Sequence, residues 1–312
     1  MRVLIVARWK EGRYAPFVTE QVDALKAQGV DCTFFPVSQK GIWGYIRHVP
    51  KLRQAIRAQK PDLIHAHYGL CGLMANLQRR IPVVTTYHGS DINDPKVRLL
   101  SNISILLSAF NVFVSPETFE MAHPGKNSAL IPCGVNLSDY PFIEKAEARE
   151  RMGWNQHTKY ILFAGAFDNP IKNASLAKQA VKQLGSADLI ELKGFSRQQV
   201  SCLMQAVDAL LMTSHTEGSP QVIKEALACG CPVVSVDVGD VRELTLGVEG
   251  CYIVGRDPEA IAQGIQQAFQ FGRRTDGMSV ILQKGLTNDR ITQRLIHIYQ
   301  EIQRCRFSRE QL

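Results

Sequence analysis

The chain has 312 residues, with 45% hydrophobic and 21% charged side chains and a formal net charge of +7. This length accommodates about two domains of roughly 150 residues, and the composition is that of an ordinary globular protein whose core needs no disulfides. The positive charge fits a phosphorylated ligand or an anionic surface, but without a basic-aromatic motif it does not predict nucleic-acid binding.

The N-terminal half alternates short apolar runs with amphipathic stretches, which is the pattern of parallel βαβ units. Residues 2–7 form the first run. Because Arg8 and Lys10 interrupt it, we expect a strand there and not a signal peptide. The predicted helices are 16–29, which ends at Gly29, and 42–59. One doubly wound sheet is expected from the strands at 2–7, 31–37, 62–68, 82–89, 111–116 and 128–134.

The same alternation starts again in the C-terminal half. Helices are predicted at 173–185 and 258–272, and a long amphipathic helix at 289–305. The strands of a second sheet are predicted at 159–167, 187–195, 209–214 and 232–239. Parallel sheets bind ligands at the carboxyl ends of their strands, so we expect the two sheets to face each other across a ligand cleft.

Two glutamates stand out in the stretch SHTEGSPQVIKEALACGCPVVSVDVGD, which runs over 214–240. Glu217 follows a predicted strand and could accept hydrogen bonds from sugar hydroxyls. Glu225 lies in an apolar helical pattern, two turns further on, where it could bind a ribose diol. The alternative for either residue is a solvated surface position, which the apolar neighbours of Glu225 disfavour.

The start of that helix is a candidate anion site. We expect Ser219 to be its N-cap, Pro220 its first residue and Gly230 its end. Amides at a helix N-terminus bind phosphates, and Gly218 would let the backbone approach a diphosphate closely.

The segment EGSPQVIKEALACGCPVV closely resembles the E-x7-E motif of the family 4 retaining glycosyltransferases. Further segments resemble that family in order along nearly the whole chain: PFVTEQVDALKAQG, KPDLIHAHYG, VVTTYHGSD, FVSPE, the hinge IPCGVNLSDYPF and the donor-phosphate loop FAGAFDNPIKN. The resemblance implies an α/β protein with the GT-B fold, in which two doubly wound, Rossmann-like domains face each other across a cleft. It implies an N-terminal acceptor-side domain, 1–147 plus the helix 290–312, and a nucleotide-sugar donor domain, 148–289.

The resemblance also implies an activity, which is transfer of a sugar from a nucleotide-diphosphate sugar to a carbohydrate or lipid-linked acceptor with retention of configuration. The setting would be polysaccharide or cell-envelope glycolipid synthesis. In the family, the residues that match His88, Glu217 and Lys172 act at the reacting groups: His88 near donor sugar and acceptor, Glu217 on the donor sugar, and Lys172 on the departing diphosphate. The donor-binding set implied or expected here is Lys172, Gly218, Ser219, Pro220 and Glu225, with Gly194 and Phe195 near the nucleobase.

We expect a hexosyltransferase that needs neither a metal nor a cofactor, because a lysine and a helix N-terminus can stabilise the leaving diphosphate and the chain has no DxD triplet. One position departs from the family: Ala166 stands where an arginine is usual, unless Arg8, Arg13 or Lys193 replaces it. A non-catalytic nucleotide-sugar-binding protein is therefore the alternative. A nicotinamide dehydrogenase is disfavoured, since no GxGxxG follows the first strand.

Eight cysteines without a CxxC pair, and the absence of an apolar run of 18 residues, favour a reducing cytoplasm. The predicted helix 42–59 carries basic residues opposite Ile46, Val49 and Ile56. Such a helix could rest on an anionic membrane, at the inner membrane face, although a solvated face is the alternative. His65 and His67 flank Ala66 at a strand end, and we expect a structural role for them, since no third metal ligand is evident.

Overall fold

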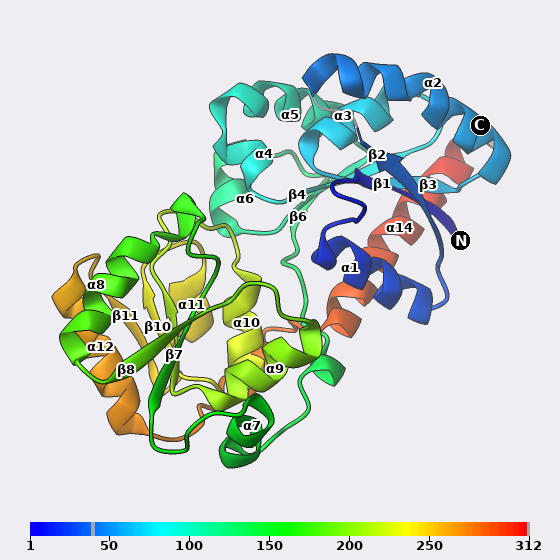
Figure 1. Cartoon of the computed structure of the whole chain (residues 1–312). Helices are drawn as coiled ribbons and strands as arrows, with labels where there is room; N and C mark the ends of the chain where they lie inside the picture. Colours follow the sequence, from blue (N-terminus) through cyan, green and yellow to red (C-terminus); the bar gives the residue numbers. More distant parts are fainter. Residues whose placement is uncertain (39–40, 311–312) are drawn as a thin grey trace. The chain divides into compact units, whose positions relative to one another are not determined.

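The computed structural model describes residues 1–38 and 41–310, which form two compact units (Figure 1). Unit 1 comprises Met1–Gly134 and the C-terminal segment from Asn288, and unit 2 comprises Val135–Thr287. The chain thus enters unit 2 at residue 135, earlier than the expected 148. The physical reason is that Val135 pairs with the returning chain, its amide donating to the Leu286 carbonyl at 2.8 Å.

Unit 1 is built on a six-stranded parallel sheet with the strand order β2-β1-β3-β4-β5-β6. Every neighbouring pair is parallel. The strands are β1 (Arg2–Arg8), β2 (Asp31–Val37), β3 (Leu63–His67), β4 (Val83–Tyr87), β5 (Phe110–Phe113) and β6 (Ser128–Leu130).

Alternate residues of β1 serve the two faces of this sheet. Val3 and Ile5 pack under α1 (Pro16–Ala27) and the C-terminal helix α14 (Asn288–Glu310), whereas Leu4 and Val6 pack under α2 (Gly41–Gln59) and α3 (Gly69–Asn76) (Figure 1). A strand that is buried on both faces must be apolar throughout, which is why the run at 2–7 was recognisable.

The C-terminal helix packs on unit 1, far in sequence from the strands that it covers. Ile291, Leu295, Ile298 and Tyr299 are buried in the same cluster as Val3 and Ile5. The Arg294 guanidinium donates to the Leu130 carbonyl of β6 at 2.7 Å. The apolar stripe of this helix is therefore buried.

The helix α2 uses its apolar residues for the core. Val49 and Ile56 are buried together with Leu52 beneath this helix. Val49 and Ile56 therefore cover the sheet and are not available to a membrane, so only the other residues of this helix could make such a contact. Trp43 and Ile46 remain exposed, at 75% and 43%.

Three further helices of unit 1 have sequence signals at their N-termini. α4 (Ser90–Asn93) follows Gly89, while α5 (Pro95–Leu107) and α6 (Pro116–Ala122) begin with proline after the capping side chains of Asp94 and Ser115.

Unit 2 has a five-stranded parallel sheet with the order β11-β10-β9-β7-β8. Helices α8 (Ala174–Leu184) and α12 (Pro258–Phe271) pack together over one face, and α9 (Arg197–Ala206) and α10 (Gln221–Ala228) lie on the other (Figure 1). The strands are β7 (Lys159–Phe163), β8 (Ala187–Glu191), β9 (Ala209–Met212), β10 (Val233–Val236) and β11 (Cys251–Val254). The remaining helices are α7 (Lys145–Met152), α11 (Val241–Thr245) and α13 (Gly277–Gln283), with short 3₁₀ turns at Leu137–Asp139 and Pro170–Lys172.

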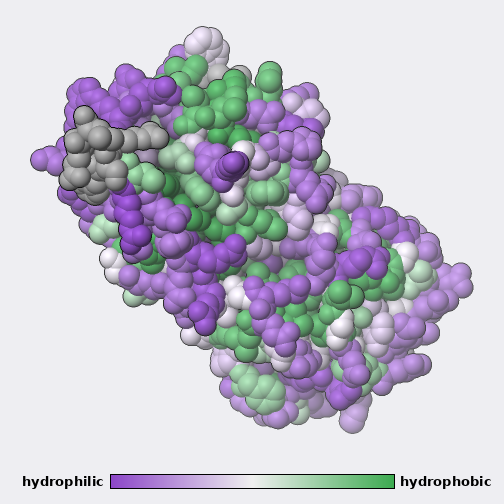
Figure 2. All heavy atoms as spheres, turned by 180° about the vertical axis from the view of Figure 1, so that it is seen from behind, coloured by the Kyte–Doolittle hydropathy of each residue, from purple (hydrophilic) through white to green (hydrophobic). Residues whose placement is uncertain are grey.

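The surface is mixed in character. In the view of Figure 2, hydrophobic residues reach the surface in several places among hydrophilic ones. The most exposed large apolar side chains include Leu99 and Leu106 of α5 and Leu246. Within residues 1–38 and 41–310, none of the helices combines the length and the apolar character that crossing a membrane requires.

Candidate active site

Two loops at the carboxyl ends of neighbouring strands are bonded together in unit 2. One follows β7 and contains Lys172, and the other follows β9 and contains Glu217. The Thr213 hydroxyl lies 2.9 Å from the Lys172 carbonyl, and the His215 amide donates to the Ile171 carbonyl at 2.8 Å. These bonds fix the two loops against each other.

Lys172 and Glu217 are brought into direct contact by this arrangement. Lys172 Nζ lies 2.6 Å from Glu217 Oε1, and both side chains are partly buried. Gly165 makes room for the lysine, because a Cβ at this position would lie 2.7 Å from Lys172 Cγ. The cation and the carboxylate that are both predicted to act on the donor thus form an ion pair at the carboxyl ends of β7 and β9.

The turn before α10 differs from the expectation. The N-cap of α10 is Pro220, and Ser219 does not cap this helix, because its hydroxyl donates to Asp240 Oδ2 at 2.6 Å. Gly218 is held by the loop after β10: its carbonyl accepts from the Asp240 amide, and a Cβ at Gly239 would lie 2.4 Å from that carbonyl. Asp240 had no signal in the sequence, since its contact is made only when the two loops meet.

Glu225 lies inside the protein, with 7% of its surface exposed, so it is not a solvated surface position. It is paired with the Arg197 guanidinium and also bonds to the Tyr140 hydroxyl. That hydroxyl in turn accepts from Arg197 Nη1 at 2.5 Å. Burial raises the pKa of Glu225, while the Arg197 charge and these hydrogen bonds act in the opposite direction. Sequence reasoning did not place either partner beside Glu225.

Gly194 and Phe195 lie in the loop that joins β8 to α9. Gly194 has a φ of +82°, which favours glycine, and Phe195 packs partly against the core. Ser196 caps α9 in a capping box with Gln199. Since Arg197 is the first residue of α9, this loop leads directly to the partner of Glu225.

Asp168, two residues after Ala166, is paired with a lysine from the loop after β8. Lys193 Nζ lies 2.6 Å from Asp168 Oδ2, and both side chains are exposed. Lys193 therefore contacts the loop that contains Ala166 through Asp168, whereas Arg8 and Arg13 belong to unit 1.

His88 belongs to unit 1 and follows β4 directly. Its ring lies against Phe17, at 4.5 Å between ring centroids, and against Tyr68, at 4.9 Å. Its backbone amide donates to Asp91 Oδ1 at 3.0 Å, and burial lowers the pKa of His88 to about 3. The imidazole is therefore neutral at pH 7.

Asp91 organises the loops around His88. Its Oδ1 also accepts from the Gly89 amide at 3.0 Å, and its Oδ2 accepts from the Gly69 amide at 2.9 Å. One carboxylate thus joins the ends of β3 and β4. Burial raises the pKa of Asp91 to about 6, against the effect of its backbone hydrogen bonds.

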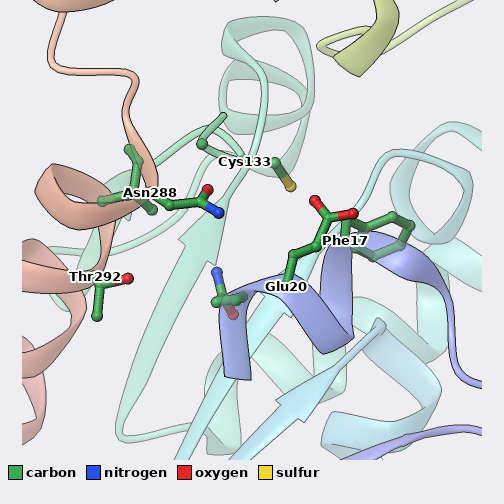
Figure 3. Close-up of a pocket in the computed structure, with 8 residues that line it drawn as sticks. Phe17, Glu20, Cys133, Asn288 and Thr292 are labelled. Atoms are coloured by element: carbon green, nitrogen blue, oxygen red, sulfur yellow. The ribbon is translucent and has the colours of Figure 1, made fainter. Parts of the chain in front are cut away.

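Phe17 also lines a narrow pocket of unit 1 (Figure 3). In the figure, Glu20 and Phe17 come from α1, Cys133 from the segment after β6, and Asn288 and Thr292 from the C-terminal segment and α14. The pocket is tightly built, since a Cβ at Gly134 would lie 2.6 Å from Asn288 Oδ1. Among the residues that the structure describes, no three His, Cys, Asp or Glu side chains are grouped to hold a metal.

The chain matches two family models along most of its length. A model described as Glycosyltransferase Family 4 matches residues 2–139, and one described as Glycosyl transferases group 1 matches residues 155–270. The first match covers the N-terminal segment of unit 1 and the first residues of unit 2, and the second lies within unit 2.

Two curated relatives illustrate the similarity. A D-inositol 3-phosphate glycosyltransferase of Thermobispora bispora is 25% identical over 264 residues, which cover 66% of this chain and 62% of the relative. The teichuronic acid biosynthesis glycosyltransferase TuaC of Bacillus subtilis is 28% identical over 240 residues, covering 66% and 60%. The matched region thus spans about three fifths of the length of these relatives.

Among solved structures, HepE of Anabaena in complex with UDP and glucose has a TM-score of 0.74 and 18% identity to this chain. The match covers 95% of this chain and 98% of HepE. The two family matches place the chain in the family 4 glycosyltransferases, and the two parallel sheets and the similarity to HepE show the GT-B fold.

Proposed function

We propose that this chain is a retaining hexosyltransferase that moves a sugar from a nucleoside-diphosphate sugar to an acceptor. The observation that carries this proposal is the Lys172–Glu217 pair, at 2.6 Å, beside the start of α10. The complex of HepE with UDP and glucose supports a donor of this class. The alternative, a binding protein without turnover, rests on Ala166 alone.

In this proposal, negative charge develops on the diphosphate as the glycosyl bond breaks. The ammonium of Lys172 and the first amides of α10 stabilise that charge in place, which is the largest effect that such a site can supply. The phosphate must either displace Glu217 from the Lys172 ammonium or bind this ammonium together with Glu217. Glu217 is then free to accept hydrogen bonds from the donor sugar.

The remaining residues take the following roles in this proposal. Glu225 binds the ribose hydroxyls, and the charge of Arg197 favours its ionised carboxylate. Gly218, Ser219 and Pro220 bring the backbone close to the diphosphate, and Gly194 and Phe195 meet the nucleobase. His88 lies near the transferred sugar and, being neutral, acts through a hydrogen bond.

The test uses the full chain with a panel of nucleoside-diphosphate sugars and no acceptor. We expect slow release of nucleoside diphosphate from one donor, unchanged by a chelator, and a Glu217→Gln variant that is at least tenfold slower. Stabilisation by nucleoside diphosphates without any release would favour the binding protein. Activity that is lost with chelator and restored by manganese would contradict metal independence. The anomeric configuration of the product decides retention.

We further propose a cytoplasmic enzyme of polysaccharide or cell-envelope glycolipid synthesis that touches the anionic inner membrane face. The name of TuaC supports the pathway class. The contact surface would be the exposed residues of α2 and α5, two helices that both pack on α3. It combines Trp43, Ile46, Leu99, Ile103 and Leu106 with the exposed cations Arg47 and Lys51. A lipid-linked acceptor would be reached from this surface.

Sedimentation with vesicles tests this contact. We expect binding to vesicles that contain anionic lipid, no binding to neutral vesicles, and loss of binding at high salt. The double variant Arg47→Gln, Lys51→Gln should weaken binding about tenfold or more. The matched control, Lys182→Gln, Lys284→Gln, removes the same charge from exposed positions of unit 2. Equal weakening by both pairs would mean that net charge, and not this surface, is responsible.

A further inference from the structure

Three histidine rings are stacked in unit 1. His65 and His67 come from β3, and His88 follows β4. The ring centroids of His65 and His67 are 4.6 Å apart, and those of His67 and His88 are 5.3 Å apart, with the ring planes nearly parallel. The first two rings are completely buried. Burial lowers the pKa of all three imidazoles, so each carries one proton at pH 7.

His65, at the end of the stack next to α14, has a defined hydrogen-bond pattern. The Tyr299 hydroxyl of α14 lies 2.5 Å from His65 Nδ1, and His65 Nε2 lies 2.7 Å from Thr86 Oγ1. Tyr299 is buried, and a buried phenol needs an acceptor. Its proton therefore points at Nδ1, which leaves His65 protonated on Nε2, the nitrogen that donates to Thr86.

The contact between His67 and His88 allows two arrangements of the protons. His67 Nδ1 and His88 Nε2 are 3.0 Å apart, so one of these nitrogens carries the proton between them. Within the described residues, His67 Nε2 is buried and has no hydrogen-bond partner. If His88 donated, His67 would hold its own proton on that buried nitrogen, where nothing accepts it. Orphaned buried N–H groups are rarer than unsatisfied acceptors. The structure therefore favours donation from His67.

We propose that His67 is a positioning residue that fixes the tautomer of His88, so that His88 presents an N–H group at Nδ1 to an oxygen of the ligand. Among the described residues, His88 Nδ1 makes no hydrogen bond, and His88 is only partly buried, whereas His67 is completely buried. This inference rests on the proposed function only for the nature of the ligand, which is the donor sugar or the acceptor. His88 is then a hydrogen-bond donor and not a base.

The backbone holds His67 in place for this role. The next residue, Tyr68, has a φ of +75°, a backbone conformation that residues other than glycine rarely adopt. It is followed by Gly69, whose amide is bound by Asp91 and where a Cβ would lie 2.1 Å from Ser101 Oγ. Strained backbone of this kind persists where the surrounding structure determines it, and it is concentrated at functional sites.

The direct test is nitrogen NMR of the full chain at pH 7, without ligand. Protonated and bare imidazole nitrogens have well-separated ¹⁵N chemical shifts, and His88 is assigned by comparison with a His88→Gln sample. We expect His88 to be protonated on Nδ1 and His67 to be bare on Nε2. A His88 ring protonated on Nε2 overturns the inference. This spectrum is independent of turnover, so it stands even if no donor is found and the proposed function fails.

Two variants, one apolar and one polar, test the role of His67. His67→Leu removes the donor and should shift the proton of His88 partly to Nε2, with kcat/KM about tenfold lower, the equivalent of one hydrogen bond. His67→Asn keeps an N–H close to the former Nδ1 and should restore both the ¹⁵N pattern and most of the activity. Tyr299→Phe is the matched control, because it removes a buried hydrogen bond from the same stack but not from His88. A His67→Leu protein with the wild-type ¹⁵N pattern overturns the inference, and if that variant does not fold, the wild-type and His67→Asn spectra decide.

Discussion

Lys172 shows how one residue depends on several neighbours. Its side chain runs past Gly165, and its ammonium ends on Glu217, in a loop that Thr213 and His215 hold in place. Each of these contacts fixes the ammonium before a ligand arrives, and such preorganisation is what makes a charge effective against a transition state.

We therefore predict that Lys172→Ala lowers kcat by about 10²- to 10³-fold, which corresponds to about 2.7–4 kcal/mol. The measurement is turnover at saturating donor, with Lys182→Ala on the exposed side of α8 as the matched control. Part of the loss comes from leaving Glu217 without its partner, so the double variant with Glu217→Gln should lose less than the sum of the two single losses. A Lys172→Ala enzyme within threefold of wild type would show that this loop does not hold the diphosphate.

At the scale of elements, the strands were predictable because parallel strands are buried on both faces. The runs at 31–37 and 62–68 correspond closely to β2 and β3. The ends of the strands were less predictable. The predicted strands 111–116 and 128–134 are shorter in the structure, as β5 (Phe110–Phe113) and β6 (Ser128–Leu130). Apolar residues continue past the ladder there because they turn into core-lining loops, for example Ile131, which is 3% exposed.

Several helices were not predicted, and α3 shows why. Its sequence, GLCGLMAN, has two glycines and no polar face, so neither propensity nor periodicity indicates a helix. The glycines are explained only by the fold: a Cβ at Gly69 would meet Ser101, and one at Gly72 would lie 2.4 Å from Ser104 Oγ. α3 packs so closely on α5 that side chains are excluded. Tertiary packing, and not local preference, makes this segment helical.

The candidate site has the same limit. A linear motif located Glu217 and Glu225, and the family resemblance added Lys172 and His88. The groups that bond to them come from elsewhere: Arg197 and Tyr140 at Glu225, and Asp91 and His67 at His88. Those partners are brought into place by strand order and loop packing, which spacing along the chain does not contain.

At the scale of the whole molecule, folding of unit 1 takes a set of titratable groups out of water. His65 and His67 become buried and neutral, and the pKa of His65 falls to about 3 from an ordinary value near 6.5. Between these two values the unfolded chain binds the proton and the folded chain does not. The stability that neutral His65 allows is therefore fully present above about pH 6.5 and is lost as the pH falls toward 3.

Asp91 acts in the opposite direction over part of this range. Burial raises the pKa of Asp91 to about 6 in the folded protein, above the value of an ordinary carboxyl group, so the folded chain binds this proton more tightly than the unfolded chain. Its contribution is present below about pH 4 and is lost as the pH rises through 6. A single carboxyl group opposes several imidazoles, and its effect begins only below its folded pKa of about 6. The histidines therefore determine whether acidification from about pH 6.5 to pH 5 raises or lowers the free energy of unfolding.

We predict that unit 1 loses stability on acidification from pH 7 to pH 5, and that each buried neutral histidine contributes about 1.4 kcal/mol per pH unit below 6.5. Hydrogen exchange of the β1 and β3 amides reports the free energy of unfolding of this unit. His65→Gln should lower the free energy of unfolding at pH 7, because two buried hydrogen bonds are disturbed, but should reduce its dependence on pH by one such increment. The exposed His297→Gln on α14 is the matched control for replacing a histidine by glutamine. An unchanged pH dependence in His65→Gln would mean that His65 is protonated inside the folded protein, and the tautomers inferred for the whole stack would then fall with it.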